Sequence, residues 1–145
     1  MLNRILITGA AVFLALSIQA QKDISWTDLM DITFKDVYIE ADDIYVYFPL
    51  FKDKQKELDG KKVAITGYII PVDVETNIYV LSAFPFSSCF FCGNAGPESV
   101  MAVYFASDDR TFKTDERLTL VGRLELNDTD IDELIYVLKG AKVRD

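Results

Sequence analysis

The sequence of 145 residues contains no histidine and only two cysteines, Cys89 and Cys92. Without histidine, the chain cannot form a Ser-His-Asp or Cys-His catalytic centre, and it cannot bind a metal through imidazole. The Cys-x-x-Cys-His motif that attaches haem is excluded for the same reason. A second Cys-x-x-Cys motif, which would complete a four-cysteine zinc site within one chain, is also absent. One short segment around the two cysteines is therefore the candidate chemical site.

Basic residues are scarce, since 15 Lys and Arg stand against 23 Asp and Glu for a net charge of −8. Such a protein repels phosphate backbones and anionic lipid, because affinity for both comes mostly from Lys and Arg. We therefore expect no nucleic-acid partner. Half of the residues are hydrophobic, among them 7 Tyr and 10 Phe, which argues against disorder.

Residues 1–20 have the layout of a secretory signal peptide. Arg4 supplies the positive charge, residues 5–18 are almost wholly apolar, and Ala20 is a small residue at the expected cleavage site. The apolar core is too short for a comfortable membrane span, and an uncleaved N-terminal anchor is the alternative. Cleavage near Ala20 removes one positive charge, so that the net charge of −8 becomes −9. We expect a periplasmic or secreted protein.

Residues 21–145 are predicted to form a single, mainly β domain, a small five-stranded barrel of OB type. Two of the predicted strands have a central glycine, Gly67 and Gly122, which is typical of a bulge or sharp bend in a curled strand. A polar stretch between the third and fourth strands leaves room for a short helix or a long loop. The alternative is an open sheet or a small sandwich. The strands are expected at residues 61–72, 77–84, 99–106, 118–126 and 133–139.

A short helical and extended segment is expected ahead of the barrel. Ser25 and Asp28 have the spacing of a helix-capping box, which predicts a helical turn with Trp26 as a core anchor. Pro49 is expected to end the second of two extended runs. These runs, followed by a charged loop or short helix, are predicted at residues 32–39, 44–48 and 51–58.

Residues 85–98, which include both cysteines, connect the second and third predicted strands. Connections present functional groups to solvent on a rigid scaffold. Gly93 would let the chain turn with its backbone N–H groups directed at the sulfurs, as in zinc knuckles. On a first interpretation, Cys89 and Cys92 are thiolate ligands of zinc or copper(I). Zinc needs four ligands, so Asp, Glu, water or a second subunit would supply the rest, and a homodimer pooling two pairs would form a four-cysteine site.

A second interpretation makes the pair a redox dithiol that exchanges disulfides with a partner. Gly93 and Pro97 follow too closely for the helix that carries this motif in thioredoxin-like enzymes, so that fold is not supported. On a third interpretation, the cysteines merely pin a loop, as a local disulfide or as two buried thiols. The alternatives to metal binding are therefore a thiol-disulfide oxidoreductase and a plain interaction module.

Four phenylalanines surround the cysteines, at positions 84, 86, 90 and 91. The favoured interpretation is that they pack the loop onto the barrel, because large apolar side chains are usually buried. If two or more of them are exposed instead, they form a docking patch around the site.

The run from Leu58 to Pro71, the segments Tyr79–Ser82 and Val100–Phe105, and Cys89 together resemble a bacterial family of small exported proteins catalogued as a domain of unknown function. The resemblance covers roughly residues 26–126. Members of that family carry Cys-x-His and prolines at this loop. Cys89 corresponds in position to the cysteine of that motif, while Cys92 corresponds to its histidine only in its role as a ligand. Because histidine and cysteine are both metal ligands, the resemblance implies metal ligation rather than redox work. The occurrence of the family beside transporter components implies an envelope partner.

We therefore expect an exported, non-enzymatic binding protein that handles metal or associates with a transporter. Its candidate metal ligands are Cys89 and Cys92, with zinc or copper(I) as the metal, and no residue is expected to be catalytic.

Overall fold

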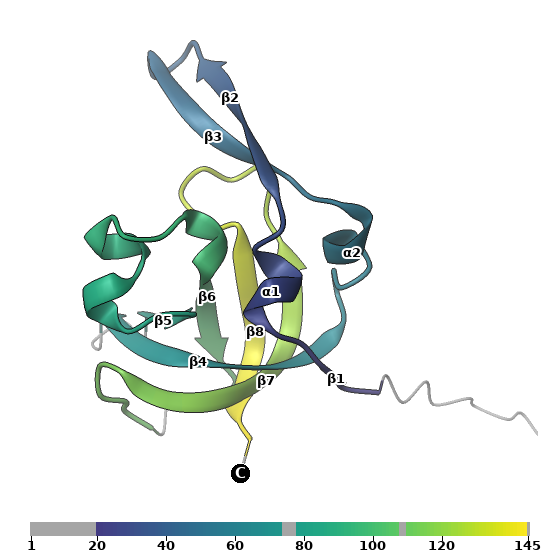
Figure 1. The fold of residues 1–145 in the computed structure, drawn as a ribbon, viewed down its shortest axis with the longest axis vertical. Helices are drawn as coiled ribbons and strands as arrows, with labels where there is room; N and C mark the ends of the chain where they lie inside the picture. Colours follow the sequence, from purple (N-terminus) through teal and green to yellow (C-terminus); the bar gives the residue numbers. More distant parts are fainter. Residues whose placement is uncertain (1–19, 74–77, 108–109, 145) are drawn as a thin grey trace, which may run out of the picture.

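A computed structural model describes residues 20–73, 78–107 and 110–144 (Figure 1). The expected signal peptide, apart from Ala20, lies outside the described residues. Within the described part of the chain, no helix is long and apolar enough to cross a membrane.

Five strands form a closed barrel in the order β4-β5-β6-β8-β7, and β7 pairs back to β4. The β6–β8 pair is parallel and the other neighbours are antiparallel. This arrangement confirms the predicted OB-type barrel. A two-residue strand, β1 (Lys22–Asp23), adds to β4 at its outer edge. The barrel strands are β4 (Lys62–Asp73), β5 (Ile78–Ser82), β6 (Val100–Phe105), β7 (Glu116–Leu126) and β8 (Tyr136–Val143).

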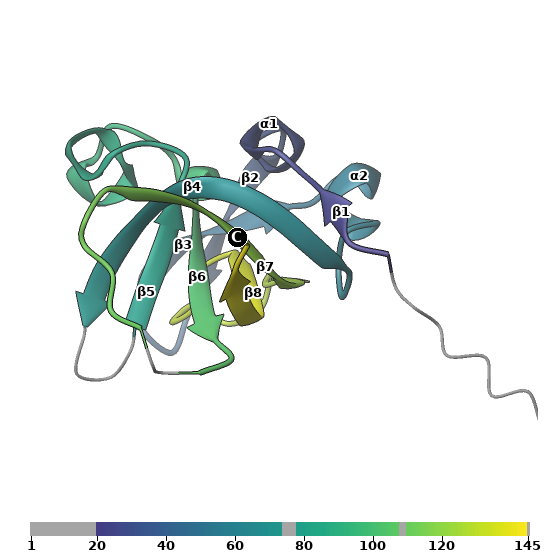
Figure 2. The same cartoon turned by 90° about the horizontal axis from the view of Figure 1, so that it is seen from below.

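The long strand β4 bends so that its first part pairs with β7 and its last part with β5 (Figure 2). The register with β7 runs unbroken through Gly67, so of the expected bulge or sharp bend the bulge is not formed, while the strand as a whole is bent (Figure 2). Instead, a Cβ at Gly67 would lie 2.6 Å from the carbonyl oxygen of Ser82, and only glycine fits this approach. At Gly122 the register between β7 and β8 does shift, between Val121 and Arg123, as the sequence predicts.

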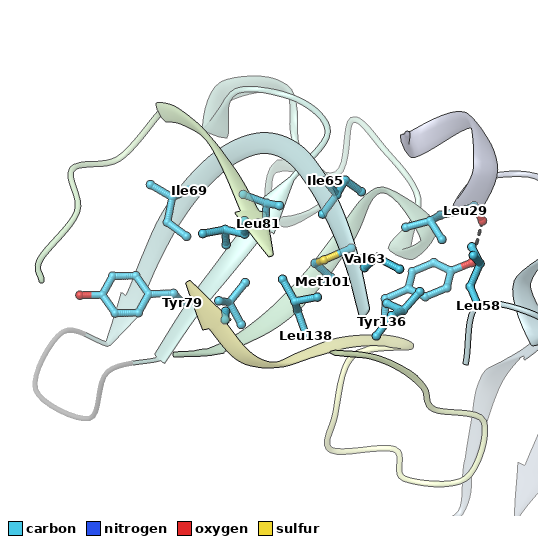
Figure 3. Close-up of a cluster of buried hydrophobic side chains, with 14 of the residues drawn as sticks. Leu29, Leu58, Val63, Ile65, Ile69, Tyr79, Leu81, Met101, Tyr136 and Leu138 are labelled. Atoms are coloured by element: carbon cyan, nitrogen blue, oxygen red, sulfur yellow. Dashed lines mark hydrogen bonds between the residues drawn. The ribbon is translucent and has the colours of Figure 1, made fainter. Parts of the chain in front are cut away.

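The core fills the barrel and extends to α1 (Trp26–Leu29) at one end. Figure 3 shows Tyr79 and Tyr136 at opposite ends of this cluster. The hydroxyl of Tyr136 donates a hydrogen bond of 2.6 Å to the carbonyl oxygen of Leu29, which ties α1 to the barrel. The indole N–H of Trp26 donates to the carbonyl oxygen of Thr66 at 2.8 Å, so the predicted anchor is confirmed.

The predicted extended runs form a hairpin of β2 (Thr33–Ile39) and β3 (Ile44–Leu50), which projects from the barrel as a separate two-stranded ribbon (Figure 1). The expectation that Pro49 ends the second run is wrong, because β3 continues through Pro49, opposite Phe34, to Leu50. A two-stranded ribbon tolerates proline, since one side of each strand has no partner that needs its N–H.

A short helix, α2 (Asp53–Lys56), follows the hairpin and settles the choice between loop and helix. The capping box at α1 is also confirmed, since the Ser25 N–H donates to the Asp28 carboxylate at 2.8 Å. The fully buried amide of Gln55 links the two helices by donating to the carbonyl oxygen of Asp28 at 2.7 Å. These contacts hold the base of the hairpin against the barrel.

Candidate functional site

Residues 83–99, here called the cysteine loop, connect β5 to β6 as the sequence predicts. The loop folds into three short 3-10 turns, η1 (Phe86–Ser88), η2 (Phe90–Cys92) and η3 (Pro97–Ser99). Gly93 ends η2 at a φ of 72°, a left-handed conformation that favours glycine. The backbone N–H of Phe86 donates to the Asp115 carboxylate at 2.7 Å, which fastens the loop to the chain before β7.

The two cysteines lie in different surroundings. Cys89 is fully buried in a small apolar cluster with Ile70, Val80 and Val100. Cys92 is exposed, and its thiol donates to the carbonyl oxygen of Phe86 at 3.0 Å. Both are free thiols in this structure. The sulfur of Cys89 therefore packs the loop onto the barrel, while the sulfur of Cys92 is accessible to solvent.

The pKa of the Cys92 thiol is raised above its ordinary value. The largest cause is desolvation, followed by the charge of the neighbouring Cys89 and a hydrogen bond between the two thiols. A raised pKa lowers the fraction of thiolate at neutral pH, and the thiolate is the attacking species in disulfide exchange. The pair is therefore close together, but its electrostatics are the reverse of those that activate a nucleophilic cysteine.

The zinc-knuckle geometry expected at Gly93 is not formed. The N–H of Gly93 donates to the carbonyl oxygen of Phe90 at 2.9 Å, and the N–H of Asn94 donates to that of Cys89 at 3.4 Å. These amides are thus bound to carbonyl groups rather than to sulfur. In the part of the chain that the structure describes, no three or more His, Cys, Asp or Glu side chains gather as a metal site. The cysteine pair alone fits a metal that accepts two sulfur ligands and falls short of four-coordinate zinc.

The phenylalanines of the cysteine loop divide into two groups. Phe90 is half-buried against the Cys89 cluster, as the favoured interpretation predicts. For the other three that interpretation is wrong, because Phe84, Phe86 and Phe91 are 37%, 43% and 47% exposed. Successive 3-10 turns direct neighbouring side chains to different sides, so a short loop cannot bury all four rings. Three exposed rings meet the condition that the sequence set for a docking patch, namely two or more exposed phenylalanines.

Phe90 and Phe91 each line a different hollow. Phe90 lies in a hollow of about 630 Å³ between the cysteine loop and the base of the hairpin. Phe91 lies in a hollow of about 220 Å³ over the outer face of β5 and β6. The first is also lined by Ile32, Phe34, Tyr47, Gly96, Pro97 and Glu98. The second includes Val72, Ile78, Tyr104, Asp132, Glu133 and Leu134.

Carboxylates stand at both hollows. In the described residues, Glu98 has no hydrogen bond or ion pair, and its carboxylate folds back over Gly96. Glu133 accepts a hydrogen bond from the Tyr104 hydroxyl, which raises the pKa of Tyr104 to about 12. Sequence reasoning missed both hollows. The only indication in the sequence was the high content of aromatic residues in 32–48 and 84–91. Such a content is equally typical of buried strands, so it did not predict a hollow.

The molecule is thus an OB-type barrel with a two-cysteine loop between its second and third barrel strands. No protein-family model matches the chain, and no curated protein matches it. Its fold is similar to the crystal structure of a DUF3299 family protein from Pseudomonas aeruginosa PAO1, with a TM-score of 0.53 and 12% sequence identity. The similarity covers 87% of this chain and 97% of that chain. At this identity it shows a shared fold with a bacterial family of unknown function, and the fold by itself carries no activity.

Proposed function

We propose that the protein is an exported, non-enzymatic binding protein and that the cysteine loop is the centre of its binding face. The observation that carries the proposal is the placement of Phe90 and Phe91, adjacent residues that line two separate hollows. Concave, mostly apolar surfaces with a few polar groups are the usual form of a ligand site. Aromatic side chains are also enriched where binding energy is concentrated.

The chemistry of the hollows favours a ligand that is apolar and positively charged. Glu98 stands at the larger hollow, and Asp132 and Glu133 stand at the smaller one. The aromatic rings add affinity for cations through their π faces. The net charge of −8 attracts such a ligand over distance. A basic, amphipathic segment of an envelope protein or transporter component would satisfy both hollows.

On this proposal, the cysteines position the phenylalanines. Phe90 packs against the small apolar cluster that contains Cys89, and Cys92 holds the end of η2 through its bond to Phe86. Both contacts fix the turn from which Phe90 and Phe91 project. The raised pKa of Cys92 favours this role over that of an attacking thiolate.

Binding is tested with a synthetic peptide of leucine and lysine, and with a counterpart in which glutamate replaces lysine. The lysine peptide should bind, and Phe90→Ala together with Phe91→Ala should weaken binding by about tenfold or more. Tyr45→Ala is the matched control, since Tyr45 is an exposed ring that lines neither hollow. Equal affinity for both peptides, or equal losses in the control, would refute the proposal.

The natural partner is sought by photo-crosslinking in intact native cells, with a photoreactive phenylalanine at position 90 or 91. Specific adducts with an envelope protein are expected at these positions and not at position 45. Fractionation of the same cells tests export, since the mature protein should be recovered outside the cytoplasm without residues 1–20.

Metal handling is the second candidate function, and the Cys-x-x-Cys spacing of two free thiols on one short loop favours it. Two adjacent thiolates are sufficient ligands for copper(I), which is soft and accepts low coordination numbers. A zinc ion would require a second copy of the chain to complete four sulfur ligands.

Anaerobic reconstitution followed by dialysis against a competing chelator tests this role. Copper(I) handling predicts about one copper per chain in the wild type and none in Cys92→Ser, a change at an exposed position. About half an equivalent of zinc, accompanied by dimerisation, would indicate the shared site instead. Retention of the metal by Cys92→Ser would exclude both.

A further inference from the structure

A second candidate site lies on the outer face of β4, β7 and β8, away from the cysteine loop in the topology. It is a hollow of about 360 Å³, here called the basic hollow. Its lining consists of Lys62, Val121, Gly122, Arg123, Lys139, Gly140 and Lys142. Four of these seven residues are cationic, in a chain whose net charge is −8. The charge of the residues that line the hollow is therefore opposite in sign to the net charge of the protein.

Three of the cations stand in a row across the sheet. Lys62 of β4 lies directly opposite Arg123 of β7, and Arg123 lies directly opposite Lys139 of β8. Residues directly opposite each other share one face of the sheet, and like charges in such pairs are destabilising. An acidic protein has many carboxylates that could alternate with these cations, yet none occupies the row. Departures of this kind from the most stable arrangement are expected at functional sites.

The neighbours of the basic hollow neutralise it only in part. Arg123 forms an ion pair of 2.7 Å with Glu125, and the Lys139 ammonium lies 4.1 Å from the centre of the Tyr104 ring. In the described chain, Lys62 and Lys142 form no ion pair. Among the described residues, one ion pair thus offsets four cationic side chains, and the lining of the hollow itself carries no acidic residue.

The floor of the basic hollow is bare at Gly140. A Cβ at Gly140 would meet no atom within 4 Å, whereas a Cβ at Gly122 would point into the barrel and lie 2.8 Å from the buried Leu138 side chain. Gly140 has a φ of 61°, which other residues adopt at a cost, so the opening is maintained by the backbone itself. A small anion can therefore approach the sheet between the long cationic side chains.

We propose that the basic hollow binds a phosphate group, either free or as part of a larger ligand such as a lipid headgroup. Arginine forms paired hydrogen bonds with phosphate oxygens, and lysines add point charges around them. A doubly charged phosphate also balances the surplus of cations better than a single carboxylate does. The proposal is independent of the binding role of the cysteine loop, because it concerns other strands and a ligand of opposite charge.

The test compares two triple variants that remove the same charge. The first is Lys62→Gln with Arg123→Gln and Lys139→Gln. The matched control is Lys35→Gln with Lys56→Gln and Lys113→Gln, three exposed lysines outside the hollow. The probes are inorganic phosphate, pyrophosphate, and phosphatidylcholine vesicles with and without phosphatidylglycerol. Binding is followed by calorimetry and by the backbone amide resonances of Gly122 and Gly140.

The wild type should bind pyrophosphate or the anionic vesicles, with shifts at Gly122 and Gly140. The first triple variant should lose about tenfold or more in affinity, while the control stays near the wild type. Binding of soluble pyrophosphate identifies a free ligand, and binding of anionic vesicles alone identifies a headgroup. If the wild type binds none of the probes, or if both triple variants weaken binding equally, the proposal is wrong. Thermal unfolding of each variant verifies that the barrel is intact.

Discussion

The barrel strands and the cysteine loop are both rich in apolar residues, but they place their side chains differently. In β6, the residues from Val100 to Val103 are all buried. In the loop just before it, Phe84, Phe86 and Phe91 remain exposed. The barrel closes upon itself, so each inward side chain gains stability from burial. The loop has no such closure, and on the proposed function its exposed rings serve binding rather than stability.

The largest effect is expected for Leu138→Ala in β8, which tests this contrast between barrel and loop. Leu138 is fully buried in the barrel cluster, so its truncation should lower the free energy of unfolding by about 2–5 kcal/mol. Phe91→Ala removes a larger side chain, yet it should change that free energy by only about 0.5 kcal/mol. Denaturant unfolding of both variants measures the difference. A loss at Phe91 as large as that at Leu138 would show that the loop is part of the core.

The two cysteines give a smaller test within the loop. Cys89→Ser places a hydroxyl in a fully apolar cluster and should cost about 1–3 kcal/mol of stability. Cys92→Ser keeps a donor near the Phe86 carbonyl at an exposed position, so its cost should stay within about 0.5 kcal/mol. Reversal of this order in chemical denaturation would contradict the separate roles assigned to the two sulfurs.

The two ends of the barrel can be compared through two buried tyrosines, Tyr79 and Tyr136. Tyr136→Phe removes the hydrogen bond to Leu29 and should cost about 1 kcal/mol. The hydroxyl of Tyr79 is buried without a hydrogen-bond partner among the described residues, so Tyr79→Phe should be neutral or slightly stabilising. Thermal unfolding of the two variants at one pH distinguishes them, and a destabilised Tyr79→Phe would reveal a partner for that hydroxyl.

The smallest expected effect is on the stability of the fold in acid. Hydrogen bonds from Lys54 and Ser25 lower the pKa of Asp28 from 3.8 to about 2. A carboxyl with a lowered pKa stabilises the fold above its unfolded pKa, and this contribution is lost as pH falls from about 4 through 2. Asp28→Asn should therefore lower stability at neutral pH by about 0.2–1 kcal/mol, approach the wild type near pH 2, and so flatten the acid dependence of stability in that window. An NMR titration of the Asp28 carboxyl checks the pKa directly.

Much of the barrel could be predicted because its signals are local. Alternation in β4 places Val63, Ile65 and Ile69 on one face, and the structure buries all three. The two central glycines lie where a neighbouring strand approaches closely, since a Cβ at either would come within 3.0 Å of that strand. At Gly67, however, the reason is the approach of the Ser82 carbonyl, a contact between strands that the sequence does not display. The end of β3 was misplaced because Pro49 breaks strands only where both sides are paired.

The candidate site was predicted only in part. The sequence by itself determined that any thiol chemistry lies at Cys89 and Cys92 and that imidazole chemistry is excluded, because the chain has no histidine and no other cysteine. It also predicted the five strands and favoured a barrel over an open sheet or a small sandwich, since strand patterns are local, and the pairing of β7 with β4 then showed the closure. Only the tertiary structure decided which sulfur is buried, which rings line the two hollows, and that Lys62, Arg123 and Lys139 stand side by side. Burial and cross-strand register depend on contacts between residues far apart in the chain, and no short stretch of sequence contains them.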